Sequence, residues 1–160
     1  NRTMVQALTG GVLAYTVPNF GINKEGTAQG EVIGGNLSIL YSLLGSSSDL
    51  DTAGKILFIE DLDEHLYHVD RMMQALKRAG KLSHLAGLVV GTMSDMHNND
   101  PSNPFGQEAE EIVAACCQEY SYPICYQFPV GHAGSNVALK LGARATLSVT
   151  GGGGTLIFNE

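Results

Sequence analysis

The sequence predicts an α/β domain with a mainly parallel sheet and additional antiparallel strands. Short apolar runs alternate with amphipathic helical patterns through the middle of the chain, in the order strand, helix, strand, helix, strand. This order is typical of right-handed parallel crossovers. Near the C-terminal end, four consecutive glycines separate two strand-like segments, which indicates an antiparallel hairpin.

The first third of the chain contains two expected strands and two expected helical segments. Residues 1–9 have the pattern of the end of a helix that belongs to an upstream segment. Strands are predicted at residues 12–17 and, more briefly, at residues 30–33. Asn36 is a favourable N-cap residue in front of apolar positions at helical spacing, so a helix is expected to begin at Leu37.

The middle of the chain provides the clearest pattern. Residues 55–59 (KILFI) are a continuous apolar run, as expected for a strand that is buried on both faces. Apolar residues then recur at helical spacing from Leu66 to Leu76, with basic residues in the last turn and Gly80 as the stop signal. A second buried strand is predicted at residues 85–90.

The last third of the chain is expected to complete the parallel sheet and to add the antiparallel layer. A third helix is predicted to carry Ala109, Ile112, Val113 and Cys116, and a further strand is predicted at residues 124–128. The hairpin is expected to join residues 145–149 to residues 155–158. The terminal strands and this hairpin would then form a second, antiparallel layer.

Composition restricts the class of protein. The chain has 160 residues, which fit one compact domain, and 44% hydrophobic residues, which exclude wholesale disorder. The formal net charge of −7 repels phosphate backbones and therefore argues against a nucleic-acid binder. No apolar run approaches the ~18 residues that a membrane span needs, and no signal-peptide hydrophobic region is expected at the start. Only 16% of the residues are charged, so part of the surface is expected to be neutral or covered by a partner.

The cysteines indicate a cytoplasmic protein. There are three, an odd number without the spacing of a disulfide framework. The adjacent Cys116 and Cys117 lie in an apolar helical pattern and are interpreted as small core residues rather than as redox or metal-binding groups. No cofactor is indicated, because neither a Walker A motif nor a Rossmann glycine fingerprint is present.

The segment around residue 65 contains several potential metal ligands. Glu64, His65 and His68 lie within one helical turn, with Asp61 close by, but the zinc-protease pattern HExxH is absent. Two surface histidines on a charged helix face explain this segment better. We therefore predict no metal.

Polar residues follow three expected parallel strands, at the edge of the sheet where ligands of such folds collect. His132 follows the strand at residues 124–128 and is flanked by glycines, so it could serve as a general base or simply as a loop histidine that binds a carbonyl group. Glu60 ends an apolar strand, so its carboxylate needs a partner and could orient the imidazole. The alternative for Glu60 is an acid at the start of the next helix, a role that suits Asp61 better.

A nucleophile to complete this pair is harder to find. Ser94, just past the strand at residues 85–90, is the local candidate. It lacks the G-x-S-x-G elbow, and no helix is expected directly behind it to supply oxyanion-hole amides. The sequence thus predicts a base and its orienting carboxylate without a nucleophile.

Four motifs in order resemble one known family. Residues 34–38 (GGNLS), 56–61 (ILFIED), 67–73 (YHVDRMM) and 131–132 (GH) are similar to the C-terminal half of the LD-carboxypeptidases, the muramoyl-tetrapeptide carboxypeptidases among serine peptidases. The resemblance extends from about residue 11 to the end of the chain. It implies a swivelling β/β/α three-layer domain at residues 11–160, with residues 1–10 as the tail of a missing N-terminal domain or a linker.

The resemblance also implies the chemistry. The family uses a Ser-His-Glu triad whose serine lies on the N-terminal domain, and Glu60 and His132 match its glutamate and histidine. Hydrolysis of an L,D peptide bond would release the terminal D-alanine from a murein tetrapeptide. Gly35, Asn36 and Gly131 are expected to line the substrate cleft, and Asn36 is equally suited to be a helix N-cap.

The chain departs from the family pattern in two respects. The G-x-S-D elbow is absent, so the isolated chain is expected to be inactive and to depend on its own missing N-terminal domain as a partner. Glu60 and His132 lie 72 residues apart, slightly further than is usual for the family, with the extra length placed in the loop at residues 96–104. Relatives are often dimeric, and an under-charged surface is compatible with a homodimer.

Two alternatives stay open. A microcin-immunity peptidase of the same family would share the triad and cleave a peptide–nucleotide. Phe105 is the only aromatic residue of the loop at residues 96–106 that could stack on a nucleobase, which favours murein. A binding module that has lost its nucleophile would instead hydrolyse nothing.

Overall fold

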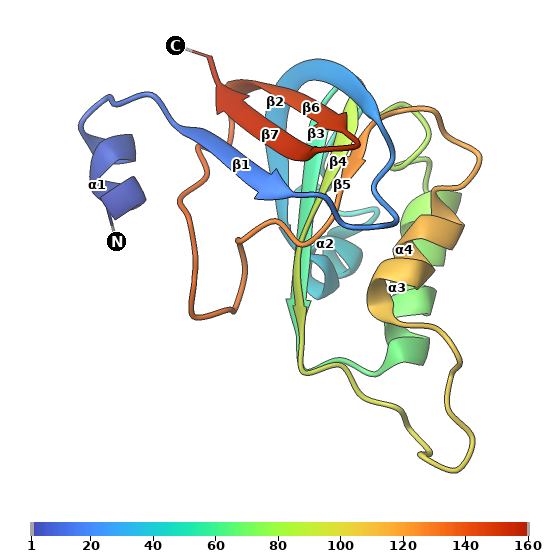
Figure 1. Cartoon of the computed structure of the whole chain (residues 1–160). Coiled ribbons are helices and arrows are strands. Elements are labelled where there is room, and N and C mark those ends of the chain that lie inside the picture. The colour runs from blue at the N-terminus through green and yellow to red at the C-terminus, as the bar shows by residue number, and fades with distance from the viewer. Residues whose placement is uncertain (1, 160) are drawn as a thin grey trace.

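The computed structural model describes residues 2–159, which form a seven-stranded mixed sheet with helices on one side of its parallel part (Figure 1). The strand order is β1-β7-β6-β2-β3-β4-β5. The elements are α1 (Arg2–Leu8), β1 (Ala14–Pro18), β2 (Gly26–Asn36), α2 (Leu37–Leu43), β3 (Ile56–Leu62), α3 (Leu66–Arg78), β4 (Gly87–Ser94), α4 (Ala109–Cys116), β5 (Ile124–Cys125), β6 (Arg144–Thr150) and β7 (Gly153–Phe158).

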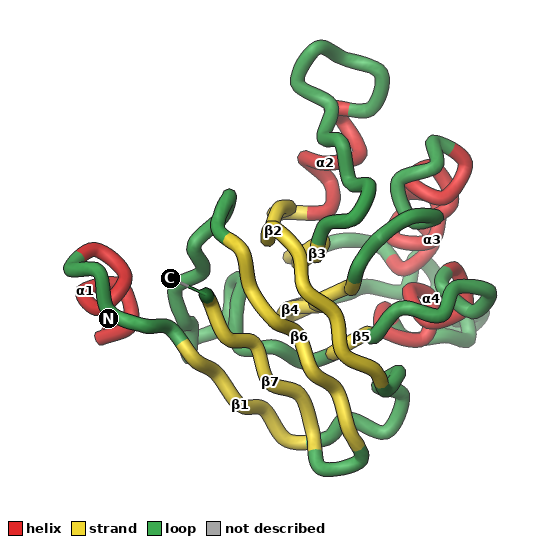
Figure 2. Tube along the Cα trace, turned by 90° about the horizontal axis from the view of Figure 1, so that it is seen from above, coloured by secondary structure: helices red, strands yellow, loops and turns green. Residues whose placement is uncertain are grey.

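Strand β2 joins the two parts of the sheet. Its first half pairs antiparallel with β6, from Gly26 opposite Val149 to Glu31 opposite Arg144. Its second half pairs parallel with β3, ending with Asn36 opposite Glu60. Seen from above, β1, β7 and β6 therefore lie to one side of β2, while the parallel strands and their helices lie to the other (Figure 2).

Two separate hydrophobic cores confirm the three-layer α/β architecture. Along β3, Leu57 and Ile59 pack into a core shared with α2, α3 and α4, as expected for helices that cover one face of a parallel sheet. Ile56 and Phe58 point to the opposite face and pack against the antiparallel strands. Because successive strand residues face opposite sides, the apolar run of β3 serves both cores.

Several predicted strand boundaries were wrong. Strand β2 has eleven residues rather than the four expected at residues 30–33, because its half-exposed first part is held by pairing with β6 rather than by burial. Strand β4 begins at Gly87, two residues later than expected, and continues past Val90 to Ser94 because Met93 and Ser94 pair with β3. Strand β5 is only two residues long, since Gln127 adopts a positive φ of 54° that interrupts an extended chain.

The hairpin turn is narrower than the run of four glycines suggested. The turn consists of residues 151–152, and Gly153 and Gly154 already belong to β7. A side chain at Gly153 would overlap the backbone oxygen of Val17, so this glycine allows β7 to approach β1 closely. The helix expected at residues 1–9 is present as α1, and none of its side chains is buried.

No helix within residues 2–159 is both long and apolar enough to cross a lipid bilayer.

Candidate active site

Glu60 lies near the carboxyl end of β3, inside the sheet. The residue is only 5% exposed, because neighbouring residues surround its side chain. On the adjacent strand β4, a Cβ at Gly91 would lie 3.1 Å from Glu60 Cβ and would overlap the oxygen of Val130. The lack of a side chain at position 91 therefore allows the Val130 backbone and Glu60 to lie close to β4.

His132 lies on the loop after β5, which is held against β4. The amide of Thr92 donates to the oxygen of Val130 at 2.9 Å, and Asn136 Nδ2 donates to the oxygen of Gly131 at 2.6 Å. Gly131 has φ 131°, a backbone conformation that favours glycine. A Cβ there would lie 2.8 Å from Glu60 Oε2, so the loop can approach the carboxylate only because residue 131 has no side chain.

The structure brings Glu60 and His132 together. His132 Nδ1 lies 2.7 Å from Glu60 Oε2, and the two side chains are 49% and 7% exposed. In a neutral imidazole whose Nδ1 donates to a carboxylate, Nε2 is left as an acceptor. A buried carboxylate beside a half-exposed imidazole is the arrangement that proton abstraction from a neighbouring hydroxyl needs.

Asn36 caps helix α2 and is tied to a buried carboxylate. Its Oδ1 accepts from the amide of Ile39 at 3.2 Å, and its Nδ2 donates to Asp61 Oδ1 at 2.8 Å. Asp61, only 2% exposed, also accepts from the amide of Ser38 at 2.9 Å. The expected N-cap role of Asn36 is confirmed, whereas the interpretation of Asp61 as an acid at the start of the following helix was wrong. Asp61 serves the preceding helix, because β2 and β3 end side by side.

The remaining predicted cleft residues lie at the same edge. Gly35 pairs with Ile59 of β3, and a Cβ there would meet no atom within 4 Å, so space is open beside it. Gly131 directly precedes His132. A substrate-binding role for Gly35, Asn36 and Gly131 stays a prediction.

No local nucleophile is joined to this pair. Ser94 is the last residue of β4, and the next helix, α4, begins only at Ala109. Within residues 2–159, no serine or cysteine side chain forms a hydrogen bond with His132. Cys116, Cys117 and Cys125 are all free and buried, which confirms their interpretation as core residues. Burial raises the pKa of Cys116 and of Cys125 to about 11, so neither thiol is a reactive thiolate at neutral pH.

The histidines around α3 contact neighbouring carboxylates and aromatic rings. His68 Nδ1 lies 2.7 Å from Glu64 Oε2, whereas the ring of His65 stacks on Tyr67 with centroids 5.4 Å apart. His97 Nε2 pairs with Asp63 Oδ1 at 2.5 Å. Residues 2–159 contain no group of three side chains placed to hold a metal ion.

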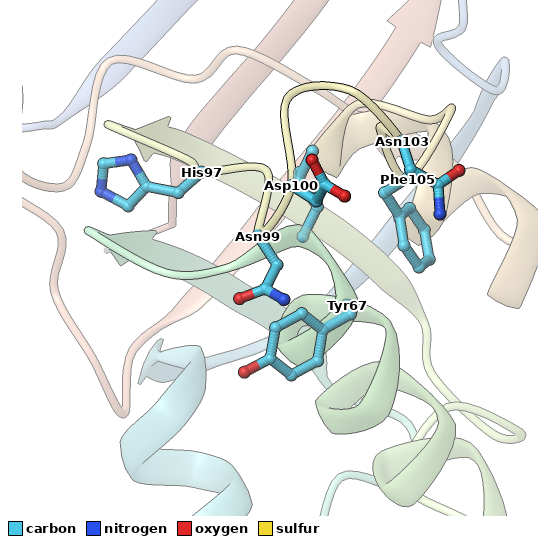
Figure 3. A pocket seen from close by; sticks show the side chains of 7 residues that line it. Tyr67, His97, Asn99, Asp100, Asn103 and Phe105 are labelled. Carbon is cyan, nitrogen blue, oxygen red and sulfur yellow. The ribbon is translucent and has the colours of Figure 1, made fainter.

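A pocket that sequence reasoning missed lies at the start of α3, where the loop after β4 covers the first helical turn (Figure 3). Tyr67 and this loop are some thirty residues apart in the sequence, and only the pairing of β3 with β4 brings them together. The one aromatic residue of the loop, Phe105, was the sequence feature that could have indicated this pocket. The lining residues are Leu66, Tyr67, His97, Asn99, Asp100, Asn103 and Phe105.

Comparison with known families identifies residues 29–147 as an LD-carboxypeptidase C-terminal domain. The chain is 40% identical over 124 residues to the probable murein peptide carboxypeptidase of Bacillus subtilis, a match that covers 77% of this chain and 38% of that protein. It is 28% identical over 132 residues to the murein tetrapeptide carboxypeptidase of Pseudomonas aeruginosa, covering 82% and 41%.

Solved structures show the same fold. The muramoyltetrapeptide carboxypeptidase of Oxalobacter formigenes superposes with a TM-score of 0.88 at 28% identity, over 99% of this chain and 54% of that one. The microcin C7 self immunity protein MccF superposes with a TM-score of 0.80 at 20% identity and shares the fold, with the same coverage. The chain spans about half the length, or less, of each of these relatives.

Proposed function

Because the chain belongs to the LD-carboxypeptidase family, we propose that it supplies the glutamate and histidine of a Ser-His-Glu triad in a murein peptide carboxypeptidase. The reaction is hydrolysis of the L,D peptide bond that releases the terminal D-alanine from a murein tetrapeptide. The hydrogen bond between buried Glu60 and half-exposed His132 is the observation that carries the proposal. Such an activity belongs to peptidoglycan recycling in the cytoplasm.

In the proposed mechanism, His132 and Glu60 act on a serine outside residues 1–160, on an N-terminal domain that is a partner of this chain. Nε2 of His132 takes the serine proton as the hydroxyl attacks the scissile carbonyl, and later returns it to the leaving amine of D-alanine. Glu60 keeps the proton of Nδ1 in place and stabilises the imidazolium that forms between these steps. The amides that stabilise the oxyanion, each worth roughly 3 kcal/mol, come from the N-terminal domain.

The test is release of D-alanine from a murein tetrapeptide, measured for the 160-residue chain and for the chain joined to its N-terminal domain. We expect activity only in the joined protein, and loss of that activity in His132→Ala. His68→Ala is the matched control, because His68 also pairs with a glutamate but lies on α3, outside the predicted triad. Activity of the 160-residue chain alone would refute the split triad and return attention to Ser94.

The fold shared with MccF supports a second candidate, a microcin-immunity peptidase that cleaves a peptide–nucleotide. The same protein assayed with an aminoacyl nucleotide analogue distinguishes the two. Hydrolysis of that analogue without release of D-alanine would favour the immunity role. Inactivity with both substrates would favour a binding module.

A further inference from the structure

The pocket at the start of α3 has the size and position of a second substrate-binding region. Its volume is about 360 Å³, within the range of small-molecule sites. Tyr67 extends from the first turn of the helix, while Asn99 and Phe105 extend from the loop that faces it (Figure 3). The walls thus come from two elements that the fold holds together.

The loop is preorganised by its own hydrogen bonds. Asn98 Oδ1 accepts from the amide of Phe105 at 2.8 Å, which closes the loop across seven residues. Asp100 Oδ1 accepts from the amide and the hydroxyl of Ser102 at 2.9 and 2.7 Å. Backbone hydrogen bonds between His97 and the residues at the start of α3 anchor the base of the loop. A ligand would therefore meet a wall that is already formed.

The pocket combines aromatic surface with unused polar groups. Tyr67 and Phe105 are each 39% exposed, and the Tyr67 ring is fixed by the Arg71 guanidinium, 5.3 Å from its centroid. Within residues 2–159, the side-chain amides of Asn99 and Asn103 have no hydrogen-bond partner, so both can donate and accept.

The Asp100 side of the pocket disfavours phosphate. Hydrogen bonds from Ser102 lower the pKa of Asp100, so this carboxylate is ionised at neutral pH. An ionised carboxylate at the wall repels an anionic group, whereas it accepts hydrogen bonds from hydroxyl groups. The Asp100 carboxylate, the two side-chain amides and the Phe105 ring together suit a neutral sugar. Its hydroxyl and acetamido groups would form hydrogen bonds with the polar groups, and its apolar face would stack on the ring.

The pocket lies at the same end of the sheet as Glu60. Leu62 and Ser94 are the last paired residues of β3 and β4, and an isolated parallel bridge between His65 and His97 leads into the pocket. Leu66 is six positions after Glu60 in the sequence, so their Cα atoms are at most ~20 Å apart. An extended tetrapeptide spans roughly 14 Å, and the attached sugar adds to that length, so a muropeptide is comparable in size with this limit.

We propose that this pocket binds the N-acetylated sugar of a muropeptide whose peptide is held at Glu60 and His132. The inference rests on the proposed function. It adds a specificity site that contacts the glycan and takes no part in the chemical step.

Sugar binding can be tested without catalysis. The probe is N,N′-diacetylchitobiose, a neutral disaccharide that carries the acetamido group, titrated into the intact protein while backbone amide signals are followed by NMR. Cellobiose, which lacks that group, and adenosine monophosphate are the comparison ligands. We expect shifts confined to Tyr67 and residues 97–105, and about tenfold weaker binding in Phe105→Ala.

Two further variants complete the binding test. Ile157→Ala removes an apolar side chain of similar exposure (43%) on β7 and should leave binding unchanged. Asn103→Ala should weaken binding while preserving the amide spectrum of the fold, which guards against a misfolded Phe105 variant. Shifts elsewhere, equal binding of cellobiose, tighter binding of adenosine monophosphate, or full binding by both pocket variants would each overturn the proposal.

Kinetics separate this inference from the proposed function. The joined enzyme should hydrolyse a muramoyl-linked tetrapeptide with a higher kcat/KM than the free tetrapeptide, and Phe105→Ala should abolish that preference. Equal rates for both substrates would refute the sugar site and leave the hydrolase proposal standing. Sugar binding in a protein that releases no D-alanine would refute the hydrolase and leave a glycan-binding site.

Discussion

Replacement of Gly131 by alanine tests whether the missing side chain at this position is what brings Glu60 and His132 together. The backbone at Gly131, with φ 131°, lies where an alanine is strained by about 1–3 kcal/mol. The added Cβ would overlap Thr92 Oγ1 and lie 2.8 Å from Glu60 Oε2, which adds about 1–3 kcal/mol of overpacking. The expected loss of unfolding free energy is therefore about 2–6 kcal/mol.

Two measurements are needed: urea unfolding gives the free energy of unfolding, and NMR of the folded protein detects the Nδ1 proton of the His132 ring. Gly134→Ala is the matched control, because it lies on the same loop, has no positive φ, and its Cβ would meet nothing within 4 Å. We expect Gly134→Ala to unfold like the original protein, within about 0.5 kcal/mol. Gly131→Ala should also weaken the signal of the Nδ1 proton, since the carboxylate must move away.

The reasoning would be refuted if Gly131→Ala left the unfolding free energy unchanged, or if both variants lost equal stability. Destabilisation with an unchanged Nδ1 proton would show that strain is relieved toward Thr92 and that the carboxylate is not displaced.

Three further predictions follow from the same region and from the core. Glu60→Gln should lower D-alanine release by the joined enzyme roughly a thousandfold, because an amide can hold the wrong tautomer of the imidazole, and undiminished release would exclude Glu60 from the triad. Asp61→Asn should lower the free energy of unfolding in urea by about 1–3 kcal/mol, because it weakens the hydrogen bond from the Ser38 amide. The control Glu25→Gln, at an exposed position, should lower it by almost nothing. Equal losses in the two variants would contradict the capping role of Asp61. The unfolding free energy should fall as the pH rises from about 9 to about 11. In the unfolded chain the Cys116 thiol has its ordinary pKa of 9.0, whereas in the folded protein burial raises this pKa to about 11, so unfolding releases a proton in this pH range. Cys116→Ala should reduce this slope, and an unchanged slope would show that another group is responsible.

The elements that could be predicted from the sequence are those whose pattern depends on burial alone. The apolar run of β3 and the helical spacing of α3 are local signals, and both elements appear close to their expected positions. Strand segments that form only by pairing with distant strands have no comparable pattern in the sequence. The polar first half of β2 and the extension of β4 to Ser94 are extended only because β6 and β3 supply hydrogen-bond partners.

The candidate site shows the same division. The sequence indicates Glu60, because a carboxylate at the end of a buried strand needs a partner. It indicates His132, because the glycines beside it allow another group to approach closely. The roles of Gly91 and Asp61 depend on which strands become neighbours, so the sequence alone could not indicate them. The pocket at α3 was missed for the same reason, since its walls are far apart along the chain.

The dual pairing of β2 has a consequence for the order in which the chain folds. The parallel layer, from the second half of β2 to β5, closes crossovers that are each completed within a few dozen residues. The antiparallel pairing of β2 must instead wait for β6, which brings Gly30 beside Ala145. Loops of that length close slowly, and contacts between such distant residues retard folding. During synthesis on the ribosome, the parallel layer can therefore form early, while one edge of β2 stays unpaired and prone to intermolecular association until the last strands emerge.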